Sequence, residues 1–95
     1  MEEQAKEVAQ VFKVLSNEKR LLIMCALFDG PLTVNEIAER VPGISLPGIS
    51  QHLTALRNAG VVSSEKHGQH VVCSIADPRF EALFDVVKRE FCTLH

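Results

Sequence analysis

The chain has 95 residues, 46% of them hydrophobic and 23% charged, and its formal net charge is −2. This composition is typical of one soluble globular domain, and no apolar run approaches the roughly 18 residues that a membrane span needs. The first four residues are acidic and polar, unlike a secretory signal, so we expect a single domain over residues 1–95 in the cytoplasm. A domain this short is only marginally stable alone, so we expect it to gain stability from a partner subunit, a metal or disulfides.

Apolar residues at helical spacing predict two helices in the first third of the chain. The first runs from about residue 3 to residue 15. Ser16 and Asn17 offer caps for the second helix, and Asp29-Gly30-Pro31 ends it. The apolar stripe of this second helix is broad, which predicts that most of it is buried: Leu21, Leu22, Met24, Cys25 and Phe28.

The next two helices are short and are joined by a turn that contains glycine. Thr33 and Glu36 form a capping box for a helix that reaches Val41, and residues 42–44 form the turn. Ser45 is the expected N-cap of the following helix, which residues 58–60 stop. Its expected buried face is Ile49, Leu53 and Leu56. Together residues 33–59 form a candidate helix-turn-helix.

A β-hairpin and a last helix complete the chain. Residues 61–66 and 69–75 have strand character, and His67-Gly68 between them has the length of a tight turn, so residues 61–75 form the expected wing. Asp77 is the expected N-cap of a helix with Pro78 in its first position, extending to about residue 94. The predicted fold is therefore mainly α with a β-hairpin, a winged helix-turn-helix with four helices, the hairpin and a fifth helix.

The exposed face of the fourth helix has side chains suited to reading DNA. Gln51 can pair with adenine through two hydrogen bonds, and Ser45 and Ser50 can donate to phosphate or base. His52 is equally compatible with a phosphate contact and with a partly buried structural role. The candidate DNA-binding residues of this helix and of the wing are Ser45, Leu46, Gly48, Ser50, Gln51, His52, Arg57, Lys66, His67 and Gly68. The alternative is a winged-helix module that binds protein instead of DNA.

The last helix has an apolar seam at alternating spacings of four and three residues. Such a seam suits packing against a symmetric copy, with the first helix alongside, and predicts a homodimer with dimer helices at about residues 3–15 and 78–94. The alternative is that this face packs on the core of its own protomer. The seam residues are Phe80, Phe84, Val87, Phe91 and Leu94.

Three segments resemble the ArsR/SmtB family of winged helix-turn-helix repressors: residues 15–21, residues 44–53 and residues 56–62. The similarity covers about residues 8–92. It implies a homodimer that binds an imperfect palindrome in double-stranded operator DNA and is released by an inducer. Leu46 and Gly48 stand where polar residues are common in that family, and the turn at Pro42-Gly43 is about one residue longer.

Many members of that family sense metals, but the usual ligand positions are unsuitable here. No cysteine lies near Val34, and Lys88, Arg89 and Phe91 stand where the last helix would need ligands. The two imidazoles of the wing are too few for zinc. We therefore expect no metal site and no cofactor, and a metal-responsive repressor is the alternative reading.

The three cysteines, Cys25, Cys73 and Cys92, show no C-x-x-C spacing. Residues 22–27 and 87–92 look like the two cysteine-bearing segments of the thiol- and persulfide-sensing branch of that family, the BigR, SqrR and HlyU type. This resemblance implies that a reactive sulfur species or an oxidant links Cys25 to Cys92 and weakens operator binding. Lys88 and Arg89 could activate Cys92 for the first attack, whereas Cys73 is expected in the core. No nucleophile and base stand at catalytic spacing, so an enzyme is not expected.

Overall fold

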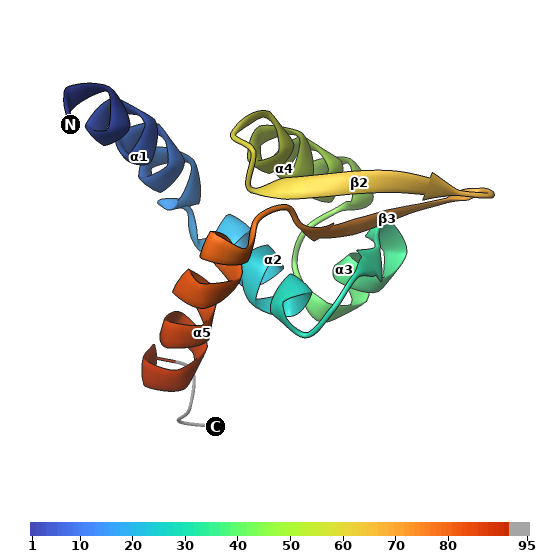
Figure 1. Ribbon diagram of the computed structural model, residues 1–95. Helices are drawn as coiled ribbons and strands as arrows, with labels where there is room; N and C mark the ends of the chain where they lie inside the picture. The colour runs from blue at the N-terminus through green and yellow to red at the C-terminus, as the bar shows by residue number, and fades with distance from the viewer. Residues whose placement is uncertain (92–95) are drawn as a thin grey trace.

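The computed structural model describes residues 1–91 as five helices and a small antiparallel sheet (Figure 1). The elements are α1 (Glu2–Leu15), α2 (Glu18–Phe28), β1 (Leu32–Thr33), α3 (Val34–Arg40), α4 (Leu46–Asn58), β2 (Val62–His67), β3 (His70–Ile75) and α5 (Pro78–Phe91). The predicted order of four helices, a hairpin and a fifth helix is confirmed, and β1 is an additional strand. Within residues 1–91, none of the helices is both long and apolar enough to cross a membrane.

The helices begin where the side chains offer caps. The Thr33 hydroxyl accepts from the backbone N–H of Glu36 at 3.1 Å, and the Glu36 carboxylate accepts from the N–H of Thr33 at 2.8 Å. The backbone N–H of Thr33 lowers the pKa of the Glu36 carboxyl most, and the Thr33 side chain lowers it further. Ser45 caps α4 through the N–H of Gly48 at 3.2 Å. Asn17 caps α2 and Asp77 caps α5 in the same way. All four caps agree with the sequence, because capping depends on residues only two or three positions apart.

The sheet has the order β1-β3-β2, and both pairings are antiparallel. The two residues before α3, Leu32 and Thr33, form the edge strand β1, and Thr33 lies opposite Val72 of β3. At the far end, His67 pairs with His70, which places Gly68 and Gln69 in the turn instead of the predicted His67 and Gly68. Gly68 has a φ of +63°, which suits the first position of a two-residue hairpin turn.

The core lies between α2, α3, α4 and the sheet. Leu53 and Leu56 of α4 and Cys73 of β3 are buried in it, as the sequence predicts. The expected face of α2 is partly wrong, because Leu21 and Leu22 are 38% and 41% exposed. Nearly every position of α2 from residue 21 is apolar, so periodicity could not identify the face that packs. The buried residues of α2 are Ile23, Met24 and Leu27.

The predicted dimer seam on α5 needs one correction. Phe84 is only 1% exposed and belongs to the core of its own protomer, so it has no surface left for a second copy. Phe80 and Val87 are half-buried against that core, and Phe91 is 75% exposed. Leu94 lies outside the described residues. The centre of this helix therefore packs on the core of its own protomer, which is the alternative to the dimer seam.

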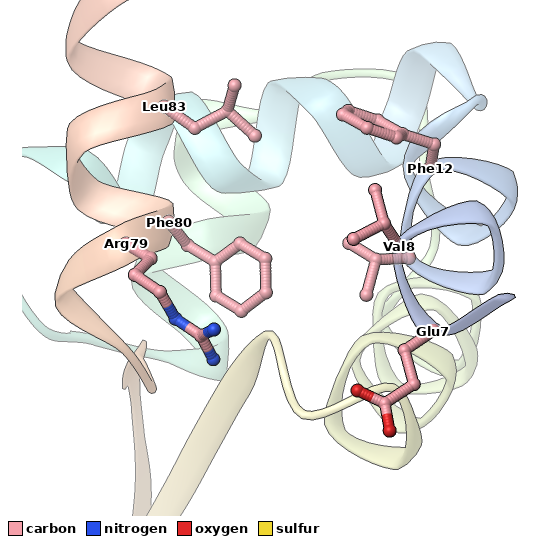
Figure 2. A pocket seen from close by; sticks show the side chains of 7 residues that line it. Glu7, Val8, Phe12, Arg79, Phe80 and Leu83 are labelled. Atoms are coloured by element: carbon pink, nitrogen blue, oxygen red, sulfur yellow. The ribbon is translucent and has the colours of Figure 1, made fainter. Parts of the chain in front are cut away.

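Helices α1 and α5 both project from the rest of the molecule (Figure 1). A groove between them is lined by side chains of both helices (Figure 2). Its volume is about 240 Å³. Phe80 and Leu83 reach into it from α5, facing Val8 and Phe12 of α1 (Figure 2). Val8 and Phe12 are 51% and 53% exposed, so α1 presents apolar surface that the protomer does not cover.

Candidate nucleic-acid interface

Helix α4 has one buried and one open face. Ile49, Leu53 and Leu56 are at most 2% exposed and fix the helix on the core. Ser50 and Gln51 lie on the exposed face in its second turn. The helix therefore presents a hydroxyl and an amide to the outside, and these groups can donate to base edges or phosphates. Ser45 and Leu46, at the start of the helix, are exposed as well.

Gly48 has a structural reason to be at its place in the first turn of α4. A Cβ at this position would lie 2.7 Å from Cγ2 of Ile44 and 3.3 Å from Oγ of Ser45. The first distance is too short for two carbon atoms, so the turn before α4 could not keep its shape. The sequence interpretation, which placed Gly48 only among outward-facing contacts, missed this close approach.

Arg57 fixes the joint between α4 and the wing. One of its terminal nitrogens, Nη1, donates to Oγ of Ser64 on β2 at 3.1 Å, and Nη2 donates to Oγ1 of Thr54 at 3.2 Å. The Thr54 hydroxyl in turn donates to the carbonyl oxygen of Ser50 at 2.9 Å. A guanidinium has five N–H donors, so Arg57 can hold this joint and still present a donor to a phosphate.

The two faces of the wing differ in charge. Ser64 and Lys66 are two positions apart on β2, so their side chains point to the same face, the one on which Ser64 meets Arg57. Glu65 and His67 point to the opposite face, where the Glu65 carboxylate lies 3.2 Å from Nε2 of His67. Lys66 thus extends the cationic edge that starts at Arg57, whereas His67 is turned toward an acidic neighbour.

His52 accepts a hydrogen bond from Arg20, a residue that the sequence interpretation missed. Nε of Arg20 donates to Nδ1 of His52 at 3.2 Å. Burial lowers the pKa of His52, and the positive charge of Arg20 lowers it further, so the imidazole is neutral at pH 7. The available signal was an arginine in the first turn of α2, directly before the apolar run that starts at Leu21.

The cysteines lie on different elements. Cys25 is half-buried on α2, which packs against α5, and Cys73 is buried in the sheet. Cys92 lies outside the described residues. Nζ of Lys88 is 3.2 Å from Oδ1 of Asp29 and 5.5 Å from the centre of the Phe28 ring, so α5 is fixed to the end of α2. Residues 1–91 contain no group of three or more His, Cys, Asp or Glu side chains that could hold a metal.

A family of known regulators matches the part of the chain that builds this surface. The sequence model described as "Bacterial regulatory protein, arsR family" matches residues 17–64, from the cap of α2 into β2. The chain belongs to the ArsR family. It is 33% identical over 92 residues to the transcriptional activator HlyU of Vibrio cholerae, covering 97% of this chain and 84% of HlyU. It is 32% identical over 93 residues to the biofilm growth-associated repressor of Xylella fastidiosa, covering 98% of this chain and 81% of that protein.

Solved structures of similar proteins share the fold. Reduced HlyU from Vibrio cholerae gives a TM-score of 0.90 at 32% identity, covering 98% of this chain and 97% of HlyU. The structure of Mb0332 from Mycobacterium bovis, a homodimeric winged helix-turn-helix DNA-binding domain, gives a TM-score of 0.79 at 34% identity. The match covers 97% of this chain and 87% of the Mb0332 chain. This ArsR-family chain is therefore a winged helix-turn-helix transcriptional regulator and not an enzyme, of the type that includes BigR and HlyU.

Proposed function

We propose that this regulator is a homodimeric repressor that binds an imperfect palindrome and leaves it when Cys25 and Cys92 are joined by oxidation or persulfidation. The observation that carries the thiol switch is the position of Cys25, which is half-buried on α2. Helix α2 packs against α5, and Phe91, the last residue of α5, directly precedes Cys92. The similarity to the HlyU and BigR type supports the same assignment. We propose a repressor because one relative is named a repressor, although another is named an activator.

In the proposed complex, α4 enters the major groove and the wing follows the adjacent backbone. The open face of α4 presents Ser50 and Gln51 to base edges, and Arg57 and Lys66 form a cationic edge for phosphates. Two such units in a symmetric dimer would read half-sites about 34 Å apart. A change in the packing of α2 against α5 would alter that separation, because α5 belongs to the proposed dimer surface.

The proposed switch is a two-step sulfur exchange with a persulfide inducer, RSSH. The Cys92 thiolate attacks the outer sulfur, forms a Cys92 persulfide and releases the thiolate RS⁻. The Cys25 thiolate then attacks the Cys92 sulfur, forms the disulfide and expels hydrosulfide. The proposed activation of Cys92 by Lys88 and Arg89 is weakened by their partners, since Asp29 lies 3.2 Å from Lys88 and Asp85 lies 2.8 Å from Arg89.

The test combines mass spectrometry with DNA binding. Wild-type protein treated with an organic persulfide should lose two hydrogens as Cys25 and Cys92 join, and should lose affinity for a duplex selected from a random DNA library. Cys92→Ser and Cys25→Ser should keep their affinity under treatment, and Cys73→Ser should respond like the wild type because Cys73 is buried in the sheet. An equal response in Cys92→Ser would refute the switch. Release by zinc or cadmium instead would support the metal-responsive alternative, and failure to retain any duplex would support the protein-binding module.

A further inference from the structure

One guanidinium links three helices behind the reading face. Nε of Arg20, in the first turn of α2, donates to Nδ1 of His52 on α4 at 3.2 Å. One of its terminal nitrogens, Nη1, donates to the carbonyl oxygen of Val14 near the end of α1, also at 3.2 Å. Arg20, His52 and Val14 are all half-buried. Water therefore competes with this contact less than with the exposed ion pairs of the surface.

This contact restricts a motion that the core leaves open. The buried leucines and isoleucine of α4 hold the helix by non-directional apolar contact, which tolerates small rotations about the helix axis. A hydrogen bond from a planar guanidinium to a ring nitrogen depends on distance and angle, so it selects one rotation. Ser50 and Gln51 precede His52 directly, and a rotation of α4 would therefore move both of them.

We propose that Arg20 is a positioning residue for operator binding: through neutral His52 it fixes α4 against α1 and α2, and protonation of His52 releases α4 and weakens binding as the pH falls. This inference rests on the operator binding proposed above. Arg20 needs no contact with DNA for this role.

The protonation state of His52 decides whether the contact can exist. Neutral imidazole has one acceptor nitrogen, and here it is Nδ1, because Arg20 donates to it. Protonated imidazole has two donors and no acceptor, and it would face a second positive charge. Arg20 is the charged group that acts on His52 from α2, and α1 contributes the Val14 carbonyl. On α4 itself, Arg57 is directed toward Thr54 and Ser64. Burial and Arg20 both lower the pKa of His52, in agreement with a neutral ring.

The direction of the pH effect separates this role from a direct phosphate contact. A histidine that touches phosphate binds DNA more tightly when it is protonated, and it increases the dependence on salt. A histidine that must accept from Arg20 does the opposite. The sign of the change therefore answers the question that the sequence left open for His52.

The experiment measures affinity for a library-selected duplex at constant ionic strength between about pH 7.5 and pH 5.5, for wild type and His52→Gln. Glutamine keeps an acceptor oxygen for Arg20 but does not titrate. At the higher pH the two proteins should agree within about twofold. At the lower pH the wild type should bind about three- to tenfold more weakly than His52→Gln. The other three histidines are present in both proteins, so their titration cancels in this ratio.

Two further variants test Arg20 itself. Arg20→Gln should weaken binding about fivefold or more at the higher pH, and substituting His52 in this background should no longer change the pH profile. Arg40→Gln is the matched loss of one charge, since Arg40 is exposed on α3 and its nearest acidic partner is Asp29 at 3.9 Å. Circular dichroism at each pH establishes that every variant is folded, and the His52→Gln comparison stands if Arg20→Gln does not fold.

Three results would be decisive against the proposals. A ratio between wild type and His52→Gln that stays constant or rises in acid would overturn the role of Arg20. Equal affinities of Arg20→Gln and Arg40→Gln would do the same. Failure of the wild type to enrich any duplex would refute the proposed operator binding itself, before the question of Arg20 arises.

Discussion

Gly48→Ala should destabilise the protein although alanine is the better helix former. At an exposed helical position, alanine is favoured over glycine by about 1 kcal/mol. Here the new Cβ would lie 2.7 Å from Cγ2 of Ile44, whose β-branched side chain has few alternative rotamers. Overpacking of this kind costs about 1–3 kcal/mol, so we expect a net loss of about 1 kcal/mol in the free energy of unfolding.

Urea unfolding at one fixed protein concentration measures this change, since the stability of a dimer depends on concentration. Ser50→Ala, on the exposed face of the same helix, is the control and should be neutral or slightly stabilising. In an Ile44→Ala background the obstacle is removed, so Gly48→Ala should change sign and stabilise by up to about 1 kcal/mol. A gain in stability from Gly48→Ala in the unmodified chain would refute the steric argument.

Three other predictions concern Arg57 at the joint between α4 and the wing, the apolar seam of α5 and the imidazole of His52. Arg57→Ala should weaken binding to all duplexes about equally. It should also reduce the salt slope by about two, one for each protomer of the proposed dimer, as titrations at several salt concentrations would show. A sequence-dependent loss would contradict a phosphate role. Phe84→Ala should cost about 3–5 kcal/mol of unfolding free energy, because Phe84 is buried. Phe91→Ala removes an exposed ring, so it should raise the dimer dissociation constant in sedimentation experiments and lower the unfolding free energy only through this weaker pairing. Folding lowers the pKa of His52, so its contribution to stability is complete above about pH 6.5. This contribution is lost as the pH falls through the pKa of His52 in the folded protein. The melting temperature of His52→Gln, measured across the same pH range, should lack this loss.

The sequence predicted best what depends on near neighbours in the chain. The caps at Thr33, Ser45 and Asp77 each involve residues two or three positions apart, and the structure has all of them. The buried face of α4 followed from a clear alternation of apolar and polar residues. For α2 the same reasoning failed at Leu21 and Leu22, because a helix that is apolar on most sides has no unique face.

What the sequence could not predict depends on distant pairs. β1 exists because Thr33 meets Val72, and two residues carry no alternation that could reveal a strand. The contact of Arg20 with His52 spans 32 positions. The packing of Phe84 into its own protomer was indistinguishable from a dimer seam, because both produce the same spacing along a helix. The candidate site was therefore predicted as a set of exposed residues, without the contacts that orient them.

The uncovered apolar side chains of α1 have a consequence for how the regulator responds to its own amount. If Val8 and Phe12 are covered by the second protomer of the proposed homodimer, pairing and the stability of the fold increase together. When most protomers are unpaired, the concentration of pairs rises with the square of the protomer concentration. Occupancy of a two-fold operator would then rise more steeply than the expression level. A cell could switch its target on by modest dilution of the protein, even without an inducer.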